Sequence, residues 1–393
     1  LLLASRLTVG RGLRSLRHRR LCHQRRVKLG DLVDVTIEIT HEGRWPLPWV
    51  MAEDLTPAAL PRTGQSARIA PLRPGGHLTL RYQLTAVRRG YHQIGPLLLE
   101  TGDLFGLARR FVAGEQAHYV LVHPRVVPIG GYGVASNRPV GEVRAERRIF
   151  EDPSRLRGVR EYRPGDKLSH VHWRASARAA TLQTKVFEPT TMIGALVCLD
   201  MYVPSYEARG VVERSELAVT AAASLATYIS AANQRVGFAS NGRDAADRAR
   251  FDPIDFEANS RSQALALARM AEQSHRLRPF EVPVGRGPTT LNGILDATAR
   301  VELSDFQPIG AMLLREFTRL PRDVSILILT PRVEQNLVEA CSAMRRSGFV
   351  LHVFVFGNET SLARQRGRLL AAGVHSYGIE SEAHLAQLAL TRL

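Results

Sequence analysis

The chain contains few cysteines and no long apolar run. Its 393 residues include three cysteines, Cys22, Cys198 and Cys341, which lie far apart in the sequence. An odd number at this spacing excludes a disulfide framework and a four-cysteine metal site, and it favours a reducing compartment. No segment approaches the roughly 20 consecutive apolar residues that span a bilayer. We therefore expect no membrane crossing within these residues.

Lysine is almost absent, although the chain is strongly basic. Of the 53 lysines and arginines only Lys28, Lys167 and Lys185 are lysines, and the formal net charge is +16. A high-GC coding bias produces such an arginine excess without any functional demand. Nine of the cations lie within residues 1–28, together with no acidic residue. Because no aromatic residue stands among them to stack on a base, nucleic-acid binding is not expected.

The motifs of common catalytic sites are missing as well. The sequence has no Gly-x-x-x-x-Gly-Lys-Ser/Thr loop to cradle a phosphate, and neither Gly-x-Ser-x-Gly nor His-Glu-x-x-His occurs. Cys198 and Cys341 stand in apolar strand or helix patterns, where a thiol normally belongs to the core. These absences predict a protein that is not an enzyme.

The amino terminus is predicted to be a basic juxtamembrane segment, residues 1–28. Leu1-Leu2-Leu3-Ala4 runs directly into the arginine cluster, which is the pattern expected at the end of a hydrophobic helix whose earlier part is missing. Basic residues that flank such a helix stay on the cytoplasmic side. This interpretation predicts a location at the cytoplasmic face of the bacterial inner membrane. The alternative is a disordered basic leader.

Composition and periodicity predict two folded domains after this segment. With 45% apolar and 23% charged residues, the chain is globular. Apolar and polar residues alternate at 31–40 and 77–85, and shorter apolar runs follow at 97–100 and 119–122. Short alternating strands separated by Gly and Pro are typical of an immunoglobulin-like β-sandwich, which we place at residues 29–128.

Residues 190–393 are predicted to form a doubly wound α/β domain, after an arginine-rich connector at 129–189. Continuously apolar strands alternate here with helices, as in a parallel sheet that is covered on both faces. The predicted strands lie at residues 192–199, 236–239, 324–329 and 349–356. The predicted helices lie at residues 213–234, 260–276, 291–300, 310–320, 333–347, 362–372 and 382–390.

Two motifs of the connector carry a resemblance to a known family. Gly158-Val-Arg-Glu-Tyr-Arg-Pro-Gly-Asp166, followed by His172-Trp-Arg-Ala-Ser-Ala-Arg178, resembles the signature of the bacterial family called domain of unknown function 58. Arg88–Tyr91, Gly102–Gly106 and Val122–Arg125 resemble the preceding motifs of that family, in the same order. The resemblance extends from about residue 27 to about residue 360.

The resemblance implies a fold and partners but no activity. The α/β domain of this family resembles a von Willebrand factor A domain, and it is usually preceded by two transmembrane helices. Members are commonly encoded beside MoxR-type AAA+ ATPases and transglutaminase-like membrane proteins. Both are therefore the expected partners, and Leu1–Ala4 would be the end of a missing helix.

The signature permits a structural or a partner-binding interpretation. A Pro-Gly turn lies at its centre, and Arg160, Arg163, Arg174 and Arg178 could pair with Glu161 and Asp166 in a rigid network. Trp173 is expected to be a buried anchor, and a zinc site at His170 and His172 lacks further ligands. The candidate structural or partner-binding residues are Arg160, Glu161, Tyr162, Arg163, Pro164, Gly165, Asp166, His172, Trp173, Arg174, Ser176, Ala177 and Arg178.

The end of the first α/β strand is the place to look for a metal. A working von Willebrand factor A site carries Asp-x-Ser-x-Ser there, because Mg²⁺ prefers oxygen ligands in an octahedral array. Asp200 is present, but Tyr202 and Pro204 replace the two serines. Thr289 or Thr290 could supply the threonine, and no aspartate follows the strand at 324–329. We predict a degenerate site at Asp200 and Thr290 and no cofactor, since independent Mg²⁺ binding is not expected.

These observations predict a membrane-associated adaptor that is not a catalyst. It would bind a MoxR-type AAA+ ATPase and the client of that ATPase, with ATP hydrolysis supplied by the partner. Two alternatives remain open: a structural component of a cell-envelope assembly, and a weak metal-dependent hydrolase that would use Asp200.

Overall fold

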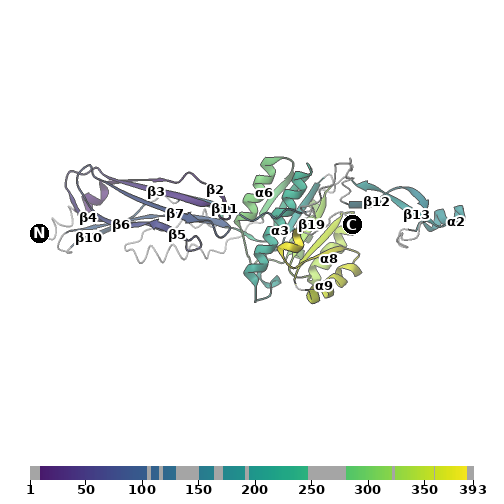
Figure 1. The fold of residues 1–393 in the computed structure, drawn as a ribbon. Coiled ribbons are helices and arrows are strands. Elements are labelled where there is room, and N and C mark those ends of the chain that lie inside the picture. Colours follow the sequence, from purple (N-terminus) through teal and green to yellow (C-terminus); the bar gives the residue numbers. More distant parts are fainter. Residues whose placement is uncertain are drawn as a thin grey trace. The chain divides into compact units, whose positions relative to one another are not determined.

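The chain is a mixed, sheet-rich α/β protein that divides into two compact units (Figure 1). The first unit comprises Leu1–Arg125, Arg243–Phe280 and Leu295–Glu302, and the second comprises Val126–Gly242, Glu281–Ile294 and Leu303–Leu393. The computed structural model describes residues 9–103, 108–114, 118–129, 150–162, 171–190, 194–246, 280–320, 324–357 and 359–386.

The first unit is built from β-strands. Three of its sheets have the strand orders β1-β3-β7-β5, β10-β9-β4-β6 and β2-β11-β8, and the short strands β16 and β18 pair with each other. The strands are β1 (Leu16–Leu21), β2 (Arg26–Lys28), β3 (Leu32–His41), β4 (Leu47–Asp54), β5 (Arg62–Gln65), β6 (Ala67–Leu72), β7 (His77–Thr85), β8 (Gly90–Ile94), β9 (Leu97–Gly102), β10 (Arg109–Ala113), β11 (His118–His123), β16 (Arg243–Asp244) and β18 (Val301–Glu302).

Alternating apolar residues build the core of this unit. Along β3 the side chains of Val33 and Val35 are buried, whereas Asp34 between them is exposed. The antiparallel partner β7 buries Leu80 and Tyr82 in the same way. One core cluster contains residues from all three sheets, since every second side chain of a strand points to the same face. The strands predicted at 31–40 and 77–85 are thereby confirmed.

Residues 16–28 differ from the prediction, which assigned residues 1–28 to a separate basic segment. They form β1, which pairs antiparallel with β3, and β2, which pairs parallel with β11. The many arginines argue against strands in this segment, because a run of cations usually indicates a solvated segment. Here the Arg20 side chain is almost fully buried against Asp54. The proposed helix end at residues 1–4 lies outside the described residues.

A buried polar cluster holds β1 against the neighbouring strands. Arg20 Nε donates to Asp54 Oδ2 at 3.2 Å, and the same guanidinium makes a second contact with the other carboxylate oxygen. The Tyr82 hydroxyl also donates to Asp54, whose side chain is inaccessible to solvent. Burial, followed by the nearby Asp54 carboxylate, raises the pKa of Tyr82. The phenol therefore stays protonated and keeps its role as a donor.

The second unit contains a six-stranded sheet with the order β17-β15-β14-β19-β20-β21. The pairs β14–β15, β14–β19, β19–β20 and β20–β21 are parallel. The strands are β14 (Gly194–Leu199), β15 (Arg235–Ser240), β17 (Phe280–Gly285), β19 (Ser325–Thr330), β20 (Leu351–Phe356) and β21 (His375–Ile379). The helices are η2 (Val203–Ser205), α3 (Val211–Ala231), α7 (Ile309–Glu316), η4 (Phe317–Arg319), α8 (Gln335–Arg346), α9 (Glu359–Ala371) and α10 (Glu382–Ala386). The helix α6 (Pro288–Arg300) begins in this unit and ends in the first.

Helices cover both faces of this sheet. Leu196 and Cys198 of β14 share a core cluster with Met312 of α7 and Cys341 of α8. All of β14 is buried, including Val197, whose side chain points to the other face, and α3 packs against β14 and β15. Strands buried on both faces read as continuous apolar runs, which is why they were predicted from the sequence.

The predicted elements of this unit agree with the structure to within a few residues at their ends, wherever they are described. The helix predicted at 260–276 lies outside the described residues. The strand β17 was not predicted, because Pro283 interrupts its apolar pattern. Proline is tolerated there because β17 lies at the edge of the sheet.

Part of the predicted connector forms a small substructure of its own. The strands β12 (Phe150–Glu161) and β13 (Gln183–Thr190) pair antiparallel in a separate two-stranded sheet, and the helix α2 (Trp173–Ala179) precedes β13. We refer to β12, α2 and β13, residues 150–162 and 171–190, as the α2 hairpin. Among the helices described, none combines the length and apolar character needed to cross a bilayer.

The Asp54 cluster generates a stability prediction. Asp54→Ala leaves the buried Arg20 guanidinium without this carboxylate, and removing one partner of a buried ion pair costs about 3–5 kcal/mol. Calorimetric unfolding of the full chain measures the loss. Tyr82→Phe is the matched control, because it removes one hydrogen bond to the same carboxylate and should cost only about 1 kcal/mol. Equal losses for the two variants would contradict the assigned role of the ion pair.

Candidate functional site

The first candidate site lies where the order of the parallel strands reverses. From β14 the chain moves to β15 on one side, and it later returns to β19 on the other side. In open α/β sheets the crevice beyond the carboxyl ends of two such strands is the usual place for a ligand. Asp200 directly follows β14, and Thr330 is the last residue of β19. The structure therefore places these two side chains at the switch point.

Donors from the protein itself surround the buried Asp200 carboxylate. Oδ1 accepts hydrogen bonds from Tyr202 N at 3.1 Å and from Asn241 Nδ2 at 2.8 Å. Oδ2 accepts one from Thr330 Oγ1 at 2.8 Å, and the Ser205 hydroxyl also bonds to the carboxylate. Burial raises the pKa of Asp200, and these hydrogen bonds act in the opposite direction. Both carboxylate oxygens are thus used within the fold.

The same network joins the loops that follow the central strands. Asn241, just beyond β15, accepts a hydrogen bond from Met201 N at 2.7 Å on its Oδ1. Its Nδ2 group also donates to Gln307 O at 3.0 Å. The Tyr206 hydroxyl donates to the carbonyl oxygen of Asp200 at 2.7 Å. These side chains fix the loops in place, which is a structural role for polar residues at strand ends.

The residues present do not fit a magnesium ion. The hydroxyl that meets Asp200 belongs to Thr330 and not to Thr290, which lies half-buried in the first turn of α6 near Gly285. Mg²⁺ needs near-octahedral oxygen ligands, whereas the Asp200 oxygens face N–H and O–H donors. In the described part of the chain, no three His, Cys, Asp or Glu side chains gather as a metal site would require.

Sequence analysis missed Asn241 and Thr330. Both are polar residues at or just beyond the end of an apolar strand, in Ser240-Asn241 and Leu329-Thr330. That pattern was the available signal. It does not indicate a metal site, because an amide or a hydroxyl that donates to a carboxylate is not a metal ligand.

The second candidate site is the α2 hairpin, which contains most of the predicted signature. Tyr162 N donates to Leu182 O at 2.7 Å, and the neighbouring Glu161 pairs with Gln183 in the sheet. His172 caps α2, because its Nδ1 accepts a hydrogen bond from Ala175 N at 3.1 Å. The signature residues Arg163, Pro164, Gly165 and Asp166 lie outside the described residues, as does His170.

Ser176 fastens α2 to the start of β13. Its hydroxyl donates to His172 O at 3.1 Å and accepts from Gln183 N at 2.8 Å. His172 N in turn donates to Gln183 O at 2.8 Å. Backbone hydrogen bonds and the Ser176 hydroxyl therefore hold the short helix in place. None of the residues of the helix is buried.

The prediction that Trp173 is a buried anchor is wrong. The residue is 69% exposed, and no residue of α2 is buried. The helix has only seven residues and lies on a hairpin of two strands. Two strands and one short helix are too small to enclose an indole ring. The backbone and Ser176, and not Trp173, therefore attach α2 to β13. Ala177 is exposed as well.

Within the described residues, the arginines of α2 do not take part in the expected network of ion pairs. Arg174 and Arg178 are both exposed, and neither makes an ion pair within the residues that the structure covers. Arg160 donates to the carbonyl oxygen of Glu161 at 3.0 Å. Pairing that involves Arg163 or Asp166 lies outside the described residues and stays a prediction.

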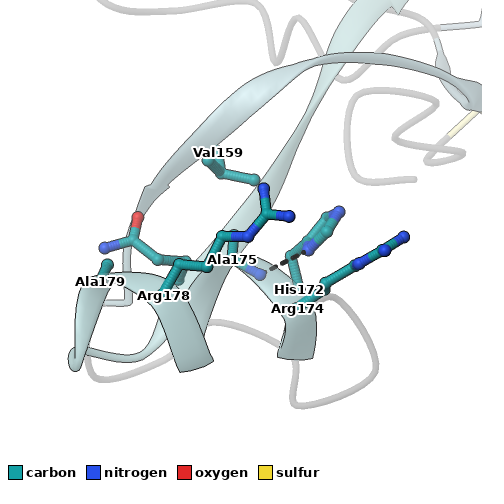
Figure 2. A pocket seen from close by; sticks show the side chains of 7 residues that line it. Val159, His172, Arg174, Ala175, Arg178 and Ala179 are labelled. Atoms are coloured by element: carbon teal, nitrogen blue, oxygen red, sulfur yellow. Dashed lines mark hydrogen bonds between the residues drawn. The ribbon is translucent and has the colours of Figure 1, made fainter.

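An open cavity of about 320 Å³ lies on the α2 hairpin. Its lining includes Val159 of β12, His172, Arg174 and Arg178 of the α2 region, and Gln183 of β13. Figure 2 shows the end of the Arg178 side chain near Val159 and the end of the Arg174 side chain farther from it, with the His172 ring between them. No carboxylate lines the cavity among the described residues. Its chemistry is that of hydrogen-bond donors beside a small apolar wall.

Comparison with known proteins identifies similar sequences without a known activity. Residues 158–276 match the family model described as "Protein of unknown function DUF58". "Uncharacterized protein YeaD" of Bacillus subtilis (strain 168) is 28% identical over 196 residues, which are 48% of this chain and 49% of that protein. The match thus spans about half the length of this curated relative. The family model covers the α2 hairpin from Gly158 onward.

Solved structures resemble parts of the chain only weakly. A FixG-related protein from Vibrio parahaemolyticus is 11% identical with a TM-score of 0.20, covering 28% of this chain and 96% of that chain. Native alpha-2-macroglobulin from Escherichia coli is 16% identical with a TM-score of 0.24, covering 29% of this chain and 19% of that chain. Similarities at this level assign neither a fold type nor a function.

The Asp200 network predicts the effects of substitution and of metal. Asp200→Ala leaves several buried donors without an acceptor, and each such group costs about 1–3 kcal/mol. Thermal unfolding should therefore shift to clearly lower temperature. Thr290→Ala is the matched control, since Thr290 is the other proposed ligand and makes no bond to Asp200 in the described structure; it should change little.

The second prediction from the Asp200 network is that divalent metal ions do not stabilise the protein. Millimolar Mg²⁺ or Mn²⁺ should leave the melting temperature of the unchanged protein where it is, because a ligand stabilises a protein only if it binds the folded state. A saturable rise in melting temperature that Asp200→Ala abolishes would contradict the structural role of the carboxylate.

Proposed function

We propose, from the match of residues 158–276 to the DUF58 family model, that the protein is a non-catalytic adaptor which binds a protein partner through its α2 hairpin. The expected partner is a AAA+ ATPase of the MoxR type, which supplies ATP hydrolysis, and the adaptor presents a client to it. A transglutaminase-like membrane protein is the second expected partner. The proposal includes a von Willebrand factor A type for the second unit and an immunoglobulin-like type for the first.

The single observation that carries the proposal is the exposure of Trp173. An indole ring that is 69% accessible exposes a large apolar area to water. Tryptophan and arginine are enriched among the residues that dominate binding energy at protein interfaces. Arg174 and Arg178, both exposed, stand on the same short helix. An exposed tryptophan next to exposed arginines is typical of a protein-binding surface.

The local backbone supports this interpretation. His172 and Ser176 fix both ends of the first turn of α2, and one backbone hydrogen bond, from His172 N to Gln183 O, joins the α2 region to β13. A rigid display lowers the entropy that binding costs, because fewer side chains and backbone angles have to be ordered when the partner arrives.

The rest of the second unit offers little reactive chemistry. Burial raises the pKa of the Cys198 thiol to about 12, and that of Cys341 to about 12 as well. A thiol with such a pKa is almost never a thiolate at neutral pH and is a poor nucleophile. The Asp200 carboxylate is engaged on both oxygens. These groups support an account in which the protein binds and positions other molecules.

Substitution of Trp173 tests the proposal. The tagged full chain is purified from a membrane extract of the source bacterium, and co-purifying proteins are identified by mass spectrometry. We expect a MoxR-type AAA+ subunit with the unchanged protein, and at least a tenfold smaller yield with Trp173→Ala, since truncating a dominant interface residue costs about 2 kcal/mol or more.

Trp45→Ala is the matched control, because Trp45 is also exposed, at 79%, and lies in the first unit. It should leave the yield unchanged. Purification that consistently lacks any AAA+ subunit would overturn the adaptor proposal. Recovery of envelope proteins alone would favour a structural component instead. Thermal unfolding of each variant checks that neither substitution disturbs the fold.

A further inference from the structure

Two arginines of α2 place positive charge at the cavity. Arg174 and Arg178 are four residues apart, so they lie on the same face of the helix. Both line the cavity, and neither forms an ion pair in the described part of the chain. Like charges at this spacing repel by about 0.2–0.5 kcal/mol. An anion bound in the cavity would be attracted by both charges.

The rest of the lining suits an anionic group. The His172 ring accepts through Nδ1 from Ala175 N, so its neutral form has Nε2 as the donor. Among the described residues the lining includes no carboxylate, and Val159 and Ala175 provide a small apolar surface. A volume of about 320 Å³ equals the share of roughly ten water molecules in the liquid. This is room for one or two side chains of an inserted segment.

We propose that this cavity binds the carboxylate side chains of an acidic segment of the protein partner. The inference rests on the proposed adaptor function and names the chemistry that the partner presents. Guanidinium groups bind carboxylates through paired N–H···O hydrogen bonds, which give both strength and orientation. Trp173, exposed beside the cavity, contacts apolar residues that flank the acidic ones.

The charge of the chain favours this occupant over two others. With a net charge of +16, a second copy of the chain is repelled by the same arginines. A nucleic acid needs a stripe of cations that follows its phosphates, whereas the cavity is lined by two arginines and an apolar wall. An acidic protein segment matches both the charge and the size.

Fluorescence anisotropy with a labelled hexaglutamate peptide tests the inference on the full chain. We expect saturable binding of hexaglutamate and none of hexaglutamine. The double substitution Arg174→Ala with Arg178→Ala should weaken hexaglutamate binding about tenfold or more, because hydrogen bonds to charged groups are lost. The matched control is Arg209→Ala with Arg346→Ala, two exposed arginines of the same unit. It removes the same net charge and should leave binding unchanged.

Three results would overturn the inference. They are no saturable binding of hexaglutamate at millimolar peptide, an equal loss in the control double variant, and tighter binding of a thymidine hexanucleotide through Arg174 and Arg178. The last result would indicate a nucleic-acid ligand. Purification of the unchanged protein and of the Arg174 and Arg178 double variant from the membrane extract separates the two proposals. If the unchanged protein binds hexaglutamate but recovers no AAA+ subunit, the adaptor function alone is refuted. If the double variant recovers as much AAA+ subunit as the unchanged protein, the cavity alone is refuted.

Discussion

The hydrogen bond between Thr330 and the buried carboxylate of Asp200 determines what the strand ends of the α/β unit can do. It spans the point where strand order reverses, which in other open sheets is the binding crevice. Asn241 and Tyr202 donate to the remaining oxygen, so both carboxylate oxygens accept hydrogen bonds that hold the loops in place. In the described structure this side chain is part of the framework.

In the α2 hairpin, unlike in the Asp200 network, large polar and aromatic side chains are exposed. Its polar backbone groups and Ser176 are engaged, whereas Trp173, Arg174 and Arg178 are displayed to solvent. Tryptophan and arginine side chains on a protein surface are groups through which proteins commonly recognise each other. The family model begins within this hairpin, at Gly158, and it includes Asp200 and Asn241 as well. The matched region thus contains both the Asp200 network and the exposed α2 residues that we propose as the binding surface.

Sequence alone predicted most of the fold and little of the site. Strands such as β14 and β7 were predictable because apolar runs and strict alternation follow directly from burial on two faces or one. The strand β1 was not, because Arg20 carries its charge into the interior and is paired there by Asp54, a contact across 34 residues that no local pattern reveals. Asp200 was predicted to matter, yet its partners Asn241 and Thr330 come from two other strands, and the exposure of Trp173 depends on the absence of a covering layer.

Hydrogen–deuterium exchange of the full chain, with and without the purified AAA+ partner, tests the central claim most directly. The account predicts that the partner slows amide exchange in residues 171–185 of the α2 hairpin and leaves the loop at 200–206 unchanged. Slowed exchange confined to the loops around Asp200, Asn241 and Thr330, with none in α2, would contradict it. That result would show that the partner binds at the strand ends and not at the α2 hairpin.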